Sequence, residues 1–253
     1  MKQIYICSDT IKGIFSAIYD AWKQIEECQE QGIALHGEVE HQLFSEYLEV
    51  VETEKKSAAV EKLIKNHLGG QAYQDLYHAL LSTDLMKGSA VLGMMKAART
   101  IPNSRKIMDH LGHPDVRKVF ELSRNVKNEA HRFIGFVRFK ELRNGVLFSE
   151  IAPKSQILTC IADHFTDRLP TQNFMIYDKT HQVFLVHQAR HQWVLVQGEQ
   201  LNRESVLAIS ETQKDFERLW QGFLNSISIK ERESSTRQRQ NVPLWYRQDM
   251  VEF

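Results

Sequence analysis

The sequence is poor in cysteine and lacks the spaced cysteine motifs that hold metals or clusters. Its 253 residues include three cysteines, Cys7, Cys28 and Cys160, which lie far apart along the chain. No CxxC pair is present, so the chain supplies no iron–sulfur cluster of its own, and we predict that it carries no cofactor. An odd number of separated thiols is typical of a reduced, cytoplasmic protein.

Long apolar runs and nucleotide-binding loops are also missing. No run is long enough to cross a bilayer and no signal peptide is recognised, so we expect a cytoplasmic protein that does not enter a membrane. The patterns GxGxxG, GxxxxGK[ST], HExxH and GxSxG do not occur, which leaves phosphate loops, zinc proteases and serine hydrolases without support. The histidines lack further ligands at zinc spacing, so we predict no metal site.

The total charge is balanced, with 32 basic and 32 acidic side chains, but the charges are unevenly placed. From Asp20 to Glu61 there are eleven acids and three bases, whereas from Arg99 to Arg143 there are eleven bases and five acids. We therefore expect a basic centre that binds an anion and an acidic front, including Glu46, Glu49, Glu52 and Glu54, that binds a basic protein partner. An acidic surface that serves only solubility stays open as the alternative.

The spacing of the apolar residues predicts an α+β protein. We expect a helical N-terminal half packed on an antiparallel sheet in the order strand, strand, helix, strand, strand, strand, followed by a C-terminal helix and a basic tail. A single domain is expected over 1–253, with a mainly helical part over 1–133, the sheet over 134–200, and the last helix and tail over 201–253. In the first part we predict a strand over 3–7, a loop over 29–37 and five helices between 8 and 111.

A hairpin is predicted around Asn144-Gly145, because this dipeptide tolerates the positive φ of a two-residue type I′ turn. This register pairs Arg143 with Val146 and places Glu141 and Glu150 on one face with two phenylalanines. A carboxyl group buried on that face would have a raised pKa, as a general acid needs. A position at the sheet edge or a pairing with lysine is the alternative.

A long helix is predicted to begin at Pro114 and to lead into the hairpin. At 100° per residue its buried arc holds seven residues: Val116, Val119, Phe120, Ser123, Val126, Ala130 and Phe133. Another side carries a basic stripe spaced to meet phosphates, formed by Arg117, Arg124, Asn128, His131 and Arg132. An ordinary exposed helix face is the alternative. Lys127 falls inside the arc, where it either reaches solvent with its ammonium group or is a desolvated pocket group.

Two further basic segments are candidates for nucleic-acid binding. Arg138 and Lys140 lie on one face of the predicted hairpin, which is either an anion-facing surface or a solvated one. In the tail, Arg237, Arg239 and Tyr246 interleave basic and aromatic groups, a common composition of nucleic-acid surfaces. A tail that merely docks on the domain is equally consistent with this composition.

The run from Glu129 to Glu141 has the pattern Glu-x-His-Arg-Phe-x-Gly-Phe-x-Arg-Phe-x-Glu. It resembles the signature of the DUF4130 family of DNA metabolism and repair proteins. The likeness extends to Ile18–Trp22, Tyr77–Ser82, Ile151-x-Pro153, Leu158, His164-Phe165, Arg168, Asp178, and Arg237-x-Arg239-Gln240 before Val242-Pro243. The sequence departs from the family pattern at Trp245-Tyr246-Arg247, where the family usually has Arg-Tyr-Trp.

This resemblance implies a bacterial protein that works beside a DNA-modifying radical SAM enzyme, and relatives are sometimes joined to a uracil-DNA-glycosylase-like domain. We therefore expect a DNA-binding accessory protein. The alternative is an enzyme that acts on a damaged or extruded nucleobase through a glutamate general acid or base. Its candidate catalytic residues are Glu141, Glu129 and His131, and the sequence leaves open whether these three converge.

Overall fold

The computed structural model describes residues 2–26, 30–37, 43–197, 242–247 and 250. The chain divides into two compact units, Met1–Lys127 and Asn128–Phe253, which we call unit 1 and unit 2. The single domain expected over 1–253 stays a prediction. The C-terminal helix and most of the tail, both expected over 201–253, lie outside the described residues. In the part of the chain that the structure describes, no helix combines the length and apolar character needed to cross a membrane.

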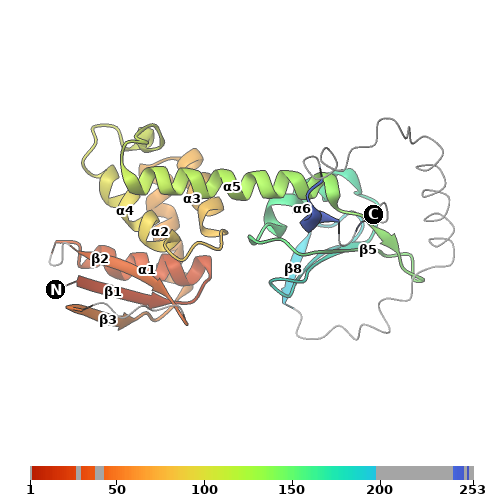
Figure 1. The fold of residues 1–253 in the computed structure, drawn as a ribbon, viewed down its shortest axis with the longest axis horizontal. Helices are drawn as coiled ribbons and strands as arrows, with labels where there is room; N and C mark the ends of the chain where they lie inside the picture. Colours follow the sequence, from red (N-terminus) through yellow and green to blue (C-terminus); the bar gives the residue numbers. More distant parts are fainter. Residues whose placement is uncertain (1, 27–29, 38–42, 198–241, 248–249, 251–253) are drawn as a thin grey trace. The chain divides into compact units, whose positions relative to one another are not determined.

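Unit 1 contains a three-stranded parallel sheet with the order β2-β1-β3 (Figure 1). The central strand β1 (Lys2–Cys7) pairs with β2 (Gln31–Leu35) and with β3 (Ser45–Glu49). The predicted strand over 3–7 is confirmed, but the loop expected over 29–37 is wrong, because it contains β2. Glycine is depleted in strands, so the sequence of β2 gives a weak local signal, and the pairing with β1 outweighs it.

The turn from β1 into α1 (Ile11–Lys23) depends on a partly buried network of hydrogen bonds. Thr10 caps the helix, since its Oγ1 accepts a hydrogen bond from the backbone N–H of Gly13 at 2.9 Å. Glu52 accepts from both the backbone N–H and the hydroxyl of Ser8, at 2.7 and 2.9 Å. A Cβ at Gly13 would lie 2.5 Å from Ser8 Oγ and 2.8 Å from Glu52 Oε1, so only glycine fits beside this carboxylate.

The remaining helices of unit 1 lie where the sequence predicts them, with small shifts at their ends. They are α2 (Glu54–His67), α3 (Gly70–Leu80) and α4 (Lys87–Ala98), and the expected short fifth helix is the 3₁₀ helix η1 (Ser104–Asp109). In Figure 1, α4 lies beside β2, and a Cβ at Gly88 would lie 2.9 Å from Ile33 Cγ2. Glycine at this position allows the helix to approach the sheet closely.

A buried carboxylate holds α5 (Pro114–Phe136) to α3 within unit 1. Asp75 accepts hydrogen bonds from Ser123 Oγ at 2.9 Å and from Lys127 Nζ at 2.5 Å. Burial alone would raise the pKa of Asp75, but hydrogen bonds from Lys127, Ser123 and Gln71 outweigh it and hold that pKa below its ordinary value. Lys127 therefore serves as the ionic partner of Asp75 at the margin of the core.

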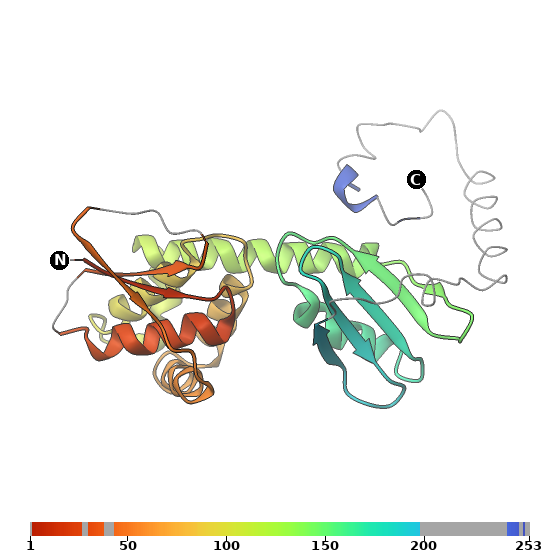
Figure 2. The ribbon, with the colours of Figure 1, turned by 90° about the horizontal axis from the view of Figure 1, so that it is seen from below.

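Unit 2 contains a five-stranded sheet with the order β4-β5-β6-β7-β8, whose strands lie side by side in Figure 2. The strands are β4 (Lys140–Glu141), β5 (Leu147–Ile151), β6 (Phe174–Asp178), β7 (Val183–His187) and β8 (Val194–Gln197). The α+β class is confirmed. The fully antiparallel sheet is wrong at one pair, because α6 (Leu158–Arg168) returns the chain to the same end and makes β5 and β6 parallel.

The hairpin between β4 and β5 has a three-residue loop in place of the predicted two-residue turn. The backbone N–H of Leu142 donates to the carbonyl oxygen of Val146, and that of Gly145 donates to the carbonyl oxygen of Leu142, both at 2.9 Å. Gly145 has a φ of 77°, as expected for a loop that a left-handed glycine closes.

The longer loop shifts the hairpin register by one residue from the predicted one. Lys140 pairs with Phe148, and Glu141 pairs with Leu147. Since a one-residue shift moves a side chain to the other face, Glu141 lies on the face opposite Phe148 and Glu150. The prediction that two glutamates and two phenylalanines share one face of the hairpin is therefore wrong.

Asp75→Asn is expected to lower the free energy of unfolding by about 1–3 kcal/mol at neutral pH, because Lys127 loses its charged partner. The folded-state pKa of Asp75 lies below its unfolded-state value. Its contribution is therefore present above the unfolded-state pKa and is lost as the pH falls through the folded-state pKa. Urea unfolding at neutral and acidic pH measures this difference, with Asp109→Asn on an exposed residue as the control. A deficit that stays constant on acidification contradicts the ionic role.

Candidate nucleic-acid interface

In unit 1, α5 carries an exposed aromatic ring between two exposed arginines. Arg117, Phe120 and Arg124 follow one another at helical spacing and fall within about 60° of arc. The Phe120 side chain is 37% exposed, and the guanidinium carbon of Arg124 lies 5.9 Å from the centre of its ring. We call these three residues the Arg-Phe-Arg stripe. Such a stripe combines phosphate-binding groups with a stacking surface.

The sequence predicted only part of this arrangement. Arg117 and Arg124 are exposed, in agreement with the predicted stripe. The prediction that Phe120 is buried is wrong. The buried arc is centred near Val119 and Val126, which leaves Phe120 at its margin and brings Leu122 inside. The other six expected residues are buried as predicted: Val116, Val119, Ser123, Val126, Ala130 and Phe133.

The predicted basic residues of unit 2 have different surroundings. Asn128, His131 and Arg132 are exposed on α5. Arg138 is half-buried, and its Nη1 donates to the carbonyl oxygens of Gly135 at 2.9 Å and Val137 at 3.2 Å. Arg138 thus satisfies carbonyl groups at the end of the helix.

Lys140 is half-buried on the edge strand β4. The predicted anion-facing surface of the hairpin therefore rests on this lysine more than on Arg138, whose guanidinium already bonds to the backbone.

The described end of the tail packs on unit 2. Tyr246, in the 3₁₀ helix η3 (Leu244–Tyr246), lies 5.0 Å from the Phe133 ring and 4.9 Å from the Phe136 ring between centroids. Trp245 Nε1 donates to the carbonyl oxygen of Ala152 at 2.8 Å. These contacts agree with the alternative in which the tail docks on the domain. The other two tail candidates, Arg237 and Arg239, lie outside the described residues.

The three candidate catalytic residues lie on two elements, Glu129 and His131 on α5 and Glu141 on β4, and have different surroundings. Glu129 accepts hydrogen bonds from the backbone N–H groups of Lys154 at 2.7 Å and Ser155 at 3.1 Å, so its carboxylate holds the segment before α6. His131 is exposed two residues further along the same helix, and therefore on a different side. Glu141 is exposed on β4. This arrangement gives no support to a shared acid–base site.

The described part of the chain contains no set of side chains suited to bind a metal ion. Over 2–26, 30–37, 43–197, 242–247 and 250, no group of three or more His, Cys, Asp or Glu side chains could hold a metal ion.

The predicted acidic surface is only partly available for a partner. Glu46 and Glu49 are exposed on β3, which is an edge strand of its sheet. Glu52 is bonded to Ser8, and Glu54 lies 3.0 Å from Lys12 Nζ in an ion pair. Glu49 also lies 3.7 Å from His36 Nε2, and Glu54 remains exposed despite its ion pair, so Glu46, Glu49 and Glu54 are accessible to a basic partner, whereas Glu52 is occupied by Ser8.

These features define an α+β protein whose long helix carries an exposed basic and aromatic face. Residues 86–252 match the sequence model of DUF4130, which is described as a domain of unknown function. The chain belongs to this family. No curated protein matches the chain. The matched residues include all of α5, whereas the likeness at Ile18–Trp22 and Tyr77–Ser82 lies outside them.

Glu129→Ala is expected to lower the free energy of unfolding by about 1–3 kcal/mol, because two backbone N–H groups lose their acceptor. Glu129→Gln keeps one acceptor oxygen and should have an intermediate effect. Hydrogen exchange measured by NMR should speed up at the amides of Lys154 and Ser155 in the alanine variant. Unchanged exchange at these two amides would show that the carboxylate does not hold the segment.

Proposed function

We propose that this protein binds single-stranded DNA through the Arg-Phe-Arg stripe and acts as an accessory protein in bacterial DNA metabolism or repair. The observation that carries the proposal is the exposed Phe120 ring beside the guanidinium of Arg124. Aromatic rings stack on unpaired bases, and flanking arginines contact the backbone phosphates. The ring favours single strands, because bases in a duplex are stacked on one another.

The surroundings of the stripe indicate that binding depends on stacking as well as on charge. Lys118 is paired with Asp84 at 2.6 Å, so its charge is partly neutralised. Glu121 is exposed on the same part of α5 and offsets one of the two arginines. A small net positive charge gives modest affinity that falls as the salt concentration rises.

The role in DNA metabolism rests on the family resemblance, and so does the partner. A radical SAM enzyme would bring the iron–sulfur cluster for which this chain has no CxxC motif. Glu46 and Glu49 lie three residues apart on the edge strand β3 and so point to opposite faces of the sheet, and a basic region of that enzyme would meet both only along the edge of the strand. We therefore propose that the acidic edge strand contacts the partner, while the stripe contacts DNA.

Arg117→Ala/Arg124→Ala is expected to weaken binding to an oligothymidine and to lower the slope of log affinity against log salt by about 1.4, because two phosphate contacts are lost. Phe120→Ala should weaken binding by about 1–3 kcal/mol and leave this slope almost unchanged, because stacking releases no counterions. Fluorescence anisotropy over a salt series measures both effects.

Two variants serve as controls for this experiment. Arg168→Ala removes an exposed arginine from α6 and should have little effect on binding. Glu121→Gln removes the acid beside the stripe and should strengthen binding. The proposal is wrong if the double arginine variant binds as tightly as the wild type, or if Arg168→Ala weakens binding as much as it does.

Glu46→Lys/Glu49→Lys is expected to weaken binding to a purified radical SAM partner at physiological salt and to leave DNA binding intact or stronger. Glu52 is left unchanged, since its replacement would disrupt the turn at Ser8. Asp109→Lys, a charge reversal on an exposed residue outside β3, is the matched control. If isothermal titration gives the same affinity for the wild type and the β3 variant, the acidic edge does not contact this partner.

A further inference from the structure

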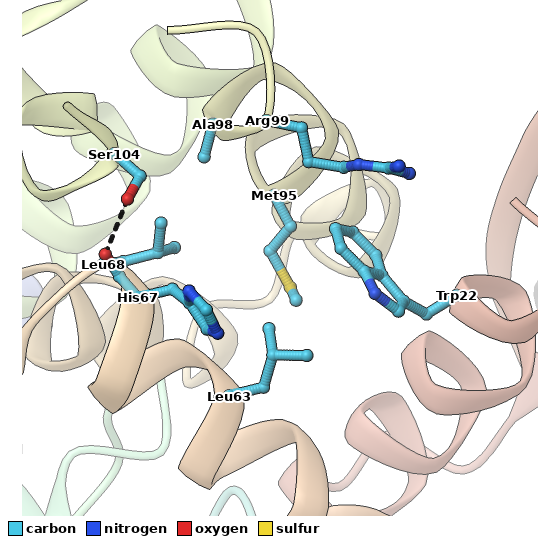
Figure 3. A pocket seen from close by; sticks show the side chains of 8 residues that line it. All are labelled: Trp22, Leu63, His67, Leu68, Met95, Ala98, Arg99 and Ser104. Carbon is cyan, nitrogen blue, oxygen red and sulfur yellow. Dashed lines mark hydrogen bonds between the residues drawn. The ribbon is translucent and has the colours of Figure 1, made fainter. Parts of the chain in front are cut away.

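Unit 1 contains a pocket of about 250 Å³ among α1, α2, α4 and η1 (Figure 3). Its floor is formed by Leu68, Met95 and Ala98, which are all buried. In Figure 3 the side chains of Trp22, Leu63 and Met95 point toward one another from three different helices. The interior is therefore apolar and carries one aromatic wall.

Polar groups lie at the rim of the pocket. The guanidinium carbon of Arg99 lies 5.7 Å from the centre of the Trp22 ring, and Arg99 itself is exposed. Ser104 Oγ donates to the backbone carbonyl oxygen of His67 at 2.7 Å, which ties η1 to the end of α2 (Figure 3). The His67 side chain is exposed beside this contact. The pocket is therefore an apolar space with the guanidinium of Arg99 at its opening.

We propose that this pocket binds a small ligand that consists of a fused two-ring aromatic system with an anionic group. A dry apolar cavity of about 150 Å³ holds one benzene ring. The present pocket, at about 250 Å³, has room for a second ring. The indole of Trp22 and the thioether of Met95 both make favourable contacts with aromatic rings. The Arg99 guanidinium can bind a phosphate or carboxylate group at the opening.

The open pocket is more consistent with a ligand than with ordinary core packing. The pocket opens to solvent, and an apolar recess with a few polar groups at its rim is the usual form of a small-molecule site. None of the pocket residues belongs to the Arg-Phe-Arg stripe, and the inference does not depend on DNA binding. Two classes of ligand share the required chemistry, namely purine nucleotides and indole carboxylates.

Isothermal titration of the full chain with AMP, adenosine, indole-3-acetate and indole tests the proposal. The charged member of at least one pair should bind about tenfold more tightly than its neutral counterpart. Arg99→Ala should remove this preference and leave the binding of the neutral compound almost unchanged. Arg105→Ala, on an exposed arginine of η1 that does not line the pocket, is the matched control.

Variants that fill the pocket identify the place of binding. Ala98→Leu adds volume at the floor and should weaken both members of the pair at least about tenfold. Leu63→Phe fills the same space from α2 and replaces it if thermal unfolding shows that Ala98→Leu is not folded. Arg117→Ala/Arg124→Ala should leave binding of these small molecules unchanged, which separates this site from the stripe.

The outcomes also distinguish the two ligand classes. A preference for AMP over adenosine assigns nucleotides, whereas a preference for indole-3-acetate over indole assigns aromatic carboxylates. The proposal is overturned if none of the four compounds binds at concentrations up to about 1 mM. It is equally overturned if the folded filling variant binds them as well as the wild type does, or if Arg99→Ala keeps the full preference for the charged compound.

Discussion

The hydrogen bonds from Ser123 and Lys127 to the buried carboxylate of Asp75 are the constraint on which the candidate interface depends. They fix which side of α5 faces the core of unit 1. The valines at positions 116, 119 and 126 are then fully buried on that side. Arg117, Phe120 and Arg124 remain outside as a consequence. The exposure of an apolar ring between two arginines thus follows from how the other side of the helix packs, and the resulting surface suits stacking on bases.

Several residues that look chemically active in the sequence stabilise backbone segments instead. Glu129 bonds two N–H groups before α6, Glu52 bonds Ser8 at the end of β1, and Arg138 bonds carbonyl groups at the end of α5. Backbone polar groups that lose water need partners, and charged side chains are strong ones. A conspicuous glutamate or arginine is therefore weak evidence for a site until its hydrogen-bond partners are known.

The sequence predicts those helices and strands that are marked by neighbouring residues, such as a capping side chain or a regular alternation of apolar and polar residues. The start of α2 follows from Thr53, whose side chain caps the helix, and the meander of β6, β7 and β8 follows from alternation. Strands β2 and β3 could not be predicted this way, because their stability comes from pairing with β1. The register of the β4–β5 hairpin is predicted incorrectly for another reason, because Asn144-Gly145 suits both a two-residue and a three-residue loop. The pocket joins Trp22, Leu63 and Ala98, which only tertiary packing brings together.

The central claim is that a base stacks on Phe120 while the two arginines hold the backbone. Photocrosslinking to single-stranded DNA that contains 5-iodouracil tests this most directly, because the excited base reacts with an aromatic ring on which it is stacked. Mass spectrometry of the digested complex should find the crosslink in the peptide that contains Phe120, and Phe120→Ala should abolish it. A crosslink that maps only to other peptides, or one of equal yield in Phe120→Ala, would contradict the account.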